Sequence, residues 1–349
     1  MVGPPPDATP PAPKAERAAE PVQVRVWRGA HVESEHRGAW VVTDTDGRIV
    51  DQAGSAGLPV WARSTVKALQ VLPLLESGGA DACGLRESEL ALACASHNAE
   101  AQHTERVRRL LERMDLGVED LQCGSQPPGD PDVRQALRAA GGHPTALHNN
   151  CSGKHAGFLA LARHLQADPK SYLDPAGEVQ RRVRTAVAEM CSVEEAQIPL
   201  ATDGCSAPTF RLPLDRMATA FARVANPEGL EADRARACER IQAAVARYPE
   251  LIAGRYKRIC TDLVRVSGGR LFAKVGAEGV YVIGVREAGV GLAVKLSDGQ
   301  GRGLFPLVVD LCERFGWLEG AALDELDRWR AGDLTNWAGR TVGRTEVLR

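Results

Sequence analysis

The sequence predicts an α+β fold: an antiparallel sheet built from both chain ends, with a helical lobe inserted between the two groups of strands. Strand-like patterns are confined to two regions, residues 22–50 and residues 271–296. The long region between them is dominated by helical periodicity and composition. Because strands and helices do not alternate along the chain, the repeating strand–helix–strand pattern of a parallel sheet is excluded.

The first group of strands begins at residue 22. Residues 22–27 alternate with a period of two, as a half-buried strand does. Residues 39–44 lead through the Asp46-Gly47 pair into residues 48–50, and an Asp-Gly pair between two such runs is a hairpin signal. We therefore expect a hairpin at this point.

The middle of the chain is expected to be helical. One helix carries Ser64 and Lys67; Pro73 should kink it or stop it early, and the Gly78-Gly79 pair should end it. Seven further segments have helical periodicity or composition: residues 87–95, 101–114, 131–140, 153–165, 177–190, 213–224 and 230–248. Three successive antiparallel strands then follow, at residues 271–275, 279–285 and 291–296.

The composition limits the kind of protein. The chain has 349 residues, 44% of them hydrophobic, which is enough for a sizeable core. A net charge of −2 argues against a nucleic-acid-binding or membrane-surface protein, and no apolar run approaches the roughly 20 residues that span a bilayer. Residues 1–21 are rich in proline and lack the apolar core of a secretory signal, so we interpret them as a disordered tail. Residues 22–349 are expected to form one compact unit with two lobes.

The cysteines point to a reducing compartment. There are nine, an odd number, scattered along a chain without an export signal. This pattern predicts reduced thiols in a cytoplasmic protein. Most of them should be small buried hydrophobic side chains.

Three serine and lysine patterns occur in order along the chain: Ser64-x-x-Lys67, Ser96-His97-Asn98 and Lys274-Val275-Gly276. Residues three apart on a helix share a face, so the Lys67 amine can sit beside the Ser64 hydroxyl and take its proton. The ordered triple has the form used by serine β-lactamases and penicillin-binding proteins, although its spacing differs from theirs. The first pattern opens a helix, the second follows a helix, and the third lies on a strand expected at the sheet edge. The triple indicates a serine nucleophile that works without histidine.

Two polar, turn-rich, thiol-bearing segments lie between these patterns, at residues 148–157 and 202–208. Function concentrates in such loops on a rigid scaffold. Cys151 and Cys205 could hold a metal ion with help from His155 or Lys154. Since no C-x-x-C pair exists, the two cysteines could equally be buried thiols.

Together these segments resemble the rhizobial-type (class 3) L-asparaginases. The resemblance runs from about residue 22 to about residue 340, and the Cys-Ser-Gly-Lys-His segment is its most specific motif. The segments that carry it are residues 33–38, 63–70, 94–97, 148–157, 203–208 and 272–279.

The resemblance implies a fold similar to that of the serine β-lactamases and the release of ammonia from L-asparagine to leave L-aspartate. It also implies serine–lysine tandems, a zinc site with an unusual lysine ligand, and a homodimer. By this resemblance the tandems are Ser64 with Lys67 and Ser96 with Lys274, the zinc ligands are Cys151, Lys154 and Cys205, and the substrate contacts are Arg63, His155 and Asp203.

This chemistry requires lysine side chains with a lowered pKa. A lysine with the usual pKa near 10.4 is almost wholly protonated at neutral pH, and lowering that pKa by about three units needs roughly 4 kcal/mol. Burial and a second positive charge can supply this, so we expect Lys67 and Lys274 to converge on the two serines. Arg63 would hold the substrate carboxylate in its planar fork and Asp203 the ammonium group, with His155 hydrogen-bonded to either end.

Two other classes of function stay open. One is a different serine hydrolase, either a glutaminase or an enzyme that interacts with β-lactams. The other is a non-enzymatic zinc-binding protein whose serines are structural. One methylene separates glutamine from asparagine, and this difference of pocket shape is not visible in the sequence.

Overall fold

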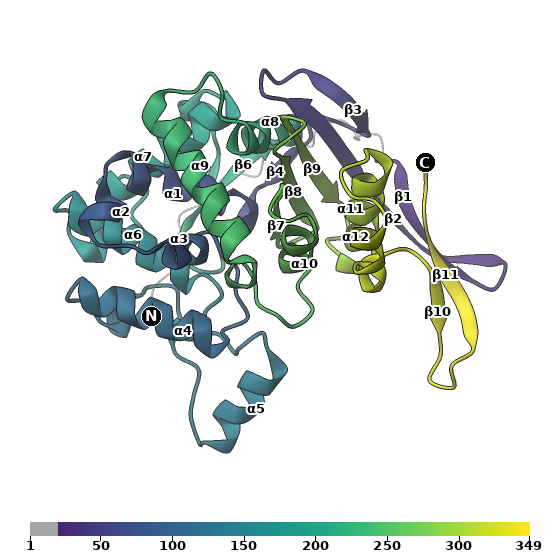
Figure 1. The fold of residues 1–349 in the computed structure, drawn as a ribbon, viewed down its shortest axis with the longest axis horizontal. Helices are drawn as coiled ribbons and strands as arrows, with labels where there is room; N and C mark the ends of the chain where they lie inside the picture. Colours follow the sequence, from purple (N-terminus) through teal and green to yellow (C-terminus); the bar gives the residue numbers. More distant parts are fainter. Residues whose placement is uncertain (1–19) are drawn as a thin grey trace, which may run out of the picture.

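One antiparallel sheet is assembled from the two ends of the chain, as predicted (Figure 1). The structure, a computed structural model, describes residues 20–349, so the predicted tail lies outside the described residues except for its last two positions. The strands of this sheet lie in the order β10-β11-β1-β2-β9-β8-β7, with β3 paired to β2, so that β7 forms an edge. They are β1 (Val22–Arg28), β2 (His31–Asp44), β3 (Ile49–Ala53), β7 (Leu271–Gly276), β8 (Val280–Val285), β9 (Val290–Leu296), β10 (Asp333–Thr335) and β11 (Thr341–Val347).

A helical lobe lies beside the sheet (Figure 1). Its helices are α1 (Lys67–Glu76), α2 (Gly79–Ala82), α3 (Glu87–Ala93), α4 (Ala101–Arg113), α5 (Pro131–Ala139), α6 (Ser152–His164), α7 (Glu178–Cys191) and α9 (Ala232–Arg247). The helices α8 (Leu214–Ala225), α10 (Ile259–Val266) and α11 (Gly301–Arg314) pack against strands of the sheet, and α12 (Ala321–Asp324) follows. A small second sheet has the order β4-β6-β5 and consists of β4 (Pro59–Trp61), β5 (Leu200–Thr202) and β6 (Pro208–Pro213). None of the helices within residues 20–349 combines the length and apolar character needed to cross a membrane.

These elements confirm the predicted α+β fold, and each of the seven segments predicted as helices begins and ends within two residues of its expected bounds. The segment around Ser64 differs from expectation. Ser64 lies in a separate 3-10 turn, η1 (Arg63–Val66), and α1 begins only at Lys67. Of the two effects expected of Pro73, the kink stays a prediction and the early stop is wrong, because α1 continues to Glu76. Its residues up to Leu75 are buried, so packing outweighs the hydrogen bond that proline removes.

The nine cysteines are all free thiols, as expected. Eight of them are buried and Cys83 is half-buried. Burial raises the pKa of Cys94 and Cys191 to about 12, so both stay protonated and behave as small apolar side chains.

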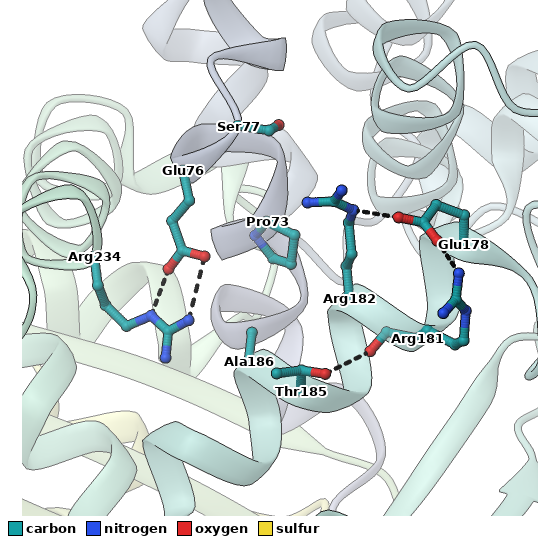
Figure 2. A pocket seen from close by; sticks show the side chains of 9 residues that line it. All are labelled: Pro73, Glu76, Ser77, Glu178, Arg181, Arg182, Thr185, Ala186 and Arg234. Atoms are coloured by element: carbon teal, nitrogen blue, oxygen red, sulfur yellow. Dashed lines mark hydrogen bonds and ion pairs between the residues drawn. The ribbon is translucent and has the colours of Figure 1, made fainter.

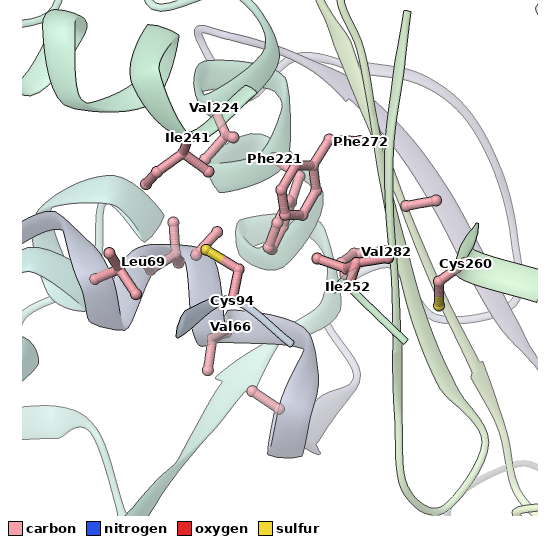
Figure 3. Packing of buried hydrophobic residues seen from close by; sticks show 14 of the residues in the cluster. Val66, Leu69, Cys94, Phe221, Val224, Ile241, Ile252, Cys260, Phe272 and Val282 are labelled. Carbon is pink, nitrogen blue, oxygen red and sulfur yellow. The ribbon is translucent and has the colours of Figure 1, made fainter. Parts of the chain in front are cut away.

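The hydrophobic interior joins the sheet to the helical lobe. Phe221 of α8 stacks on Phe272 of β7, with ring centroids 5.6 Å apart. Figure 3 shows the same cluster reaching Val66 of η1, Leu69 of α1 and Ile241 of α9. The turn that carries Ser64 and the strand that carries Lys274 are therefore fixed to one core.

The close approach of α8 to β9 depends on Gly291. A Cβ atom added there would lie 1.9 Å from the carbonyl oxygen of Ala218, so the helix would have to move. We expect Gly291→Ala to lower the free energy of unfolding by about 1–3 kcal/mol, the usual cost of overpacking, as measured by urea denaturation. Gly332→Ala is the control, because a Cβ atom there meets nothing within 4 Å. Equal stability of the two variants would contradict this account.

Candidate active site

Four segments that are far apart in the sequence meet beside the edge strand β7. They are the turn η1 with the start of α1, the loop after α3, the start of α6 and the loop between β5 and β6. With β7 they carry all ten site residues that the sequence singles out. A cleft of about 170 Å³ lies here, and its lining residues are Arg63, Ser64, Gln126, Asn149, Asn150, Cys151, Asp203, Gly204, Cys205 and Ala277.

Ser96 accepts hydrogen bonds from both lysines. The Nζ atom of Lys274 lies 2.9 Å from the Ser96 hydroxyl oxygen, and the Nζ atom of Lys67 lies 3.0 Å from it. Both lysines are 1% exposed and Ser96 is 5% exposed. The structure thus brings the predicted Ser96–Lys274 tandem together and adds Lys67 to it.

The environment of Lys274 favours the neutral amine. Burial and then the positive charge of Lys67 are the two largest causes that lower the pKa of Lys274 to about 7. About half of the Lys274 amines are therefore neutral near pH 7. Such a group can accept or donate a proton at that pH, which general acid–base catalysis requires.

Ser64 lies apart from this cluster. It lines the cleft and is half-buried. The Lys67 side chain extends past it into the interior, where its amine donates to the Ala95 carbonyl, to Ser96 and, at 3.2 Å, to the Cys151 sulfur. Within residues 20–349 no side chain hydrogen-bonds to the Ser64 hydroxyl, so the expected Ser64–Lys67 contact is not formed.

Arg63 and Asp203 form an ion pair at the cleft. The Arg63 Nε atom lies 2.7 Å from the Asp203 Oδ1 atom. Although burial opposes the charge of Asp203, the N–H of Gly204 and the charges of Arg63 and Lys154 hold the pKa of this carboxyl below its usual value. Arg63 has a backbone φ of +49°, an uncommon conformation for a residue other than glycine. Two of the three residues predicted to bind substrate therefore line the cleft with opposite charges, and Arg63 does so from a strained turn.

His155 lies outside the cleft lining, and it is fully buried in α6. Its Nδ1 atom is 2.7 Å from the Tyr172 hydroxyl, which also accepts the N–H of Gln122 at 2.7 Å. Burial, and then the charges of Lys154 and Lys67, keep the pKa of His155 well below its usual value, so it is neutral. The structure brings His155 close to Lys154 and Tyr172 but does not bring it to the cleft.

The three predicted zinc ligands form a buried group, which we call the thiol cluster: Cys151, Cys205 and Lys154. The Lys154 Nζ atom lies 3.2 Å from the Cys205 sulfur. The neighbouring Cys205 thiol, with the charges of Lys67 and Lys154, keeps the pKa of Cys151 well below its usual value against the effect of burial. The two sulfur atoms are donors that zinc prefers, whereas a lysine amine is a rare zinc ligand. No group of three or more His, Cys, Asp or Glu side chains within residues 20–349 could hold a metal ion, so a metal site here requires the lysine.

Some cleft residues received no role from the sequence. Asn149 accepts the N–H of Cys151 at 2.9 Å and donates to the Cys123 carbonyl at 2.7 Å, which fixes the start of α6. Gln126 accepts the N–H of Asn150 at 3.2 Å. The polar composition of residues 148–157 was a signal for the two asparagines, whereas Gln126 lies in a loop that shows no pattern.

A larger cleft, of about 320 Å³, lies between α1 and α7 and shares no lining residue with the first (Figure 2). Its charged side chains all form ion pairs: Glu76 pairs with Arg234, and Glu178 pairs with Arg181 and Arg182. No residue that lines it belongs to the buried cluster of Ser96, Lys67 and Lys274, which lies beside the smaller cleft. The candidate active site is therefore the smaller cleft at Ser64.

Comparisons with solved structures find weak likenesses. A native form of Mglu, crystallised in 4.3 M NaCl, is 18% identical, with a TM-score of 0.37, and the match covers 82% of this chain and 63% of that one. A β-lactamase from Mycobacterium bovis is 15% identical, with a TM-score of 0.41, and the match covers 80% of this chain and 95% of that one. The chain thus covers less than two thirds of the length of that Mglu chain.

Sequence comparisons give a clearer result. No curated protein sequence matches the chain. A family model described as L-asparaginase II matches residues 24–347, which is nearly all of the chain that the structure describes. The chain therefore belongs to the L-asparaginase II family, a family of enzymes.

Proposed function

We propose that this chain is an L-asparagine amidohydrolase, which converts L-asparagine and water to L-aspartate and ammonia. One observation carries the proposal: the buried Ser96 hydroxyl accepts hydrogen bonds from two lysine amines beside a cleft lined by Ser64. A shared hydroxyl lets a proton pass from one amine to the other, and this is what amide hydrolysis by serine and lysine requires. Membership of the L-asparaginase II family favours asparagine as the substrate.

Ser64 acts as the nucleophile in this proposal, because it lines the cleft whereas Ser96 is buried. Lys67 first gives its own proton through Ser96 to the neutral amine of Lys274 and turns toward Ser64. The Ser64 oxygen attacks the side-chain amide carbon, and its proton passes to Lys67. Ser96 and Lys274 relay a proton to the amide nitrogen, the C–N bond breaks and ammonia leaves. Water then attacks the ester on Ser64, which releases L-aspartate and returns a proton to the serine.

Arg63 and Asp203 select an amino acid in this proposal. The α-carboxylate of asparagine would bind the guanidinium of Arg63, and its α-ammonium group would bind the carboxylate of Asp203. Their ion pair supports this, since both charges already face the cleft before substrate arrives. His155 is buried beside Lys154. Its predicted contact with substrate would therefore need a movement of α6 or of the loops that line the cleft.

The thiol cluster would hold zinc. Zinc bound by Cys151, Cys205 and Lys154 would supply a fixed positive charge and brace the two loops that line the cleft. Burial disfavours a charge on Lys154, but the sulfur atoms of Cys205 and Cys151 outweigh burial and raise its pKa. Lys154 is therefore protonated before metal binds, and coordination must release that proton.

We expect zinc affinity to fall as the pH drops, because acid protonates the amine and the thiols that must be bare to bind the metal. Elemental analysis gives the stoichiometry, and competition with a chromophoric chelator at several pH values gives the affinity. Cys205→Ser should lose the metal, whereas Cys83→Ser, a half-buried cysteine outside the thiol cluster, should keep it. Wild-type protein without stoichiometric zinc would leave Cys151 and Cys205 as buried thiols.

The function is tested by ammonia release from L-asparagine and L-glutamine by the purified chain, side by side. Preference for asparagine supports the proposal, and preference for glutamine would make the chain a glutaminase. Hydrolysis of a chromogenic β-lactam without ammonia release would indicate a β-lactam-interacting serine hydrolase. Zinc binding without either activity would indicate a non-enzymatic zinc-binding protein.

The homodimer is also part of the proposal. It is supported by the resemblance to the rhizobial-type enzymes. Sedimentation equilibrium of the purified chain tests it, and a mass of one chain at micromolar concentration would contradict it.

A further inference from the structure

Arg258 lies beside Ser96 and forms no ion pair with any acidic side chain of residues 20–349. It is the residue before α10, and its guanidinium donates to neutral oxygen atoms. The Nη2 atom lies 2.6 Å from the Ser96 carbonyl oxygen, and the Nη1 atom lies 2.5 Å from Oδ1 of Asn98. Burial lowers the pKa of Arg258, but a guanidinium still keeps its charge at neutral pH. A fixed positive charge therefore lies next to the serine that the two lysines share.

The bonds of Arg258 belong to a larger set that holds the Ser96 segment. The N–H of Ser96 donates to the Ile252 carbonyl at 2.9 Å, and the N–H of Asn98 donates to the Ala253 carbonyl at 2.8 Å. Arg258 comes from the same stretch of chain. Its guanidinium donates to an oxygen atom of each of the same two residues, Ser96 and Asn98. Residues 252–258 thus bond to the N–H groups of Ser96 and Asn98 and to an oxygen atom of each, which fixes the backbone on which the Ser96 hydroxyl is carried.

The charge of Arg258 also acts on Lys274. Lys67 and Arg258 lower the pKa of Lys274, in addition to the larger effect of burial, whereas Cys260 and Cys151 raise it. The neighbours of the Lys274 amine that carry or can carry charge are Lys67 on α1, Cys94 after α3, Cys151 before α6, and Arg258 and Cys260 at the start of α10. Lys67 and Arg258 are the cations among these neighbours. Lys67 bonds to the Ser96 hydroxyl and to the thiol cluster, whereas Arg258 bonds to neither.

We propose that Arg258 is a positioning residue for the amide hydrolysis: it fixes Ser96 between the two lysines and places beside the Lys274 amine a positive charge that Glu100 faces without forming an ion pair. This inference rests on the proposed function. Arg258 does not line the cleft, so it acts through Ser96 and Lys274 and not on the substrate.

The test compares Arg258→Gln with Arg258→Lys in ammonia release from L-asparagine across pH 5 to 9. In Arg258→Gln the charge is lost, so the acidic limb of kcat/KM should move up by about one pH unit, the size of effect that a nearby charge has on a buried group. A shift of the Lys274 pKa from about 7 to about 8 lowers the fraction of neutral Lys274 amine at pH 7 about fivefold, and the rate falls with it. KM should stay the same. Arg258→Lys keeps the charge, so its limb should stay at the wild-type position while kcat falls, because one ammonium cannot replace both arms of the guanidinium.

Arg265→Gln is the matched control, since Arg265 is on α10 but pairs with Glu325 at the surface. It should match the wild type. If Arg258 merely braces the fold, the Gln variant will lose rate and melting temperature with its acidic limb unmoved, and that result overturns the inference. So does a limb that moves equally in the Gln and Lys variants.

A second readout does not depend on the reaction. The chain has only seven lysines, so NMR of protein labelled with 13C at the lysine Cε atoms can follow each amine, with Lys274→Met assigning the resonance. The midpoint of Lys274 titration should rise by about one unit in Arg258→Gln and stay in place in Arg258→Lys. This shift in a chain that releases no ammonia would contradict the proposed function alone, whereas an active wild type without the shift would contradict the inference alone.

Discussion

Replacing Ser64 by alanine is expected to reduce ammonia release from L-asparagine by about a thousandfold or more, because removal of a nucleophile abolishes the covalent route. No buried hydrogen bond of the described chain is lost, since Ser64 is half-buried and its hydroxyl has no side-chain partner within residues 20–349. The variant should therefore keep the melting temperature of the wild type. A coupled assay of ammonia with the purified proteins measures the change.

Two further variants make this result decisive. Ser77→Ala is the control, since Ser77 caps the other end of α1 and lies outside the small cleft. It should keep the wild-type rate. Ser96→Ala separates the two serines: a Ser64→Ala enzyme that retains most of its rate, beside an inactive Ser96→Ala enzyme, would make Ser96 the nucleophile.

Replacing Lys274 by methionine is expected to lower kcat by about a hundred- to ten-thousandfold, the usual contribution of a general acid–base group. The pH dependence of kcat/KM tests the same role of Lys274. Because the pKa of Lys274 is lowered to about 7, the neutral amine predominates above that pH and is lost as the pH falls through it. The kcat/KM of the wild type should therefore fall on the acidic side with a midpoint near 7, and Lys274→Met should lack this limb.

Lys170→Met is the matched control for this measurement. Lys170 is exposed and lies far along the chain from any cleft residue, so its loss should leave both rate and pH profile unchanged. An acidic limb near pH 7 that persists in Lys274→Met would assign it to another group and would remove Lys274 from the proton relay.

The fold was largely predictable because its signals are local. The alternation in residues 22–27, the Asp46-Gly47 turn and the periodicity of α4 or α9 each depend on a few neighbouring residues. The pairing of β1 with β11 was not predictable, because β10 has only three residues and β11 buries only Thr345, so neither shows a hydrophobic alternation. The failure at Pro73 has the same origin: burial of α1 comes from distant elements, and it overrides the local preference of proline.

The features of the candidate active site were also predictable only where a short stretch of sequence determines them. The Ser96–Lys274 contact and the thiol cluster could be anticipated from short motifs. The direction of Lys67 could not, since a lysine reaches any of several acceptors and only the folded chain decides which one lies closest. Arg258 gave no signal at all, because its partners are a backbone carbonyl and an amide oxygen, which no spacing in the sequence reveals.

Because β1 lies between β2 and β11, it pairs with its two neighbours at very different times during synthesis of the chain. Val24 pairs with Val347, so the first strand cannot gain its second neighbour until almost the entire described chain has left the ribosome. At about 5–20 residues per second this delay is tens of seconds, during which β1 keeps an open edge. Open edges capture other strands, so newly made chains are more prone to aggregate than finished ones, and chaperone supply should limit the yield of expression.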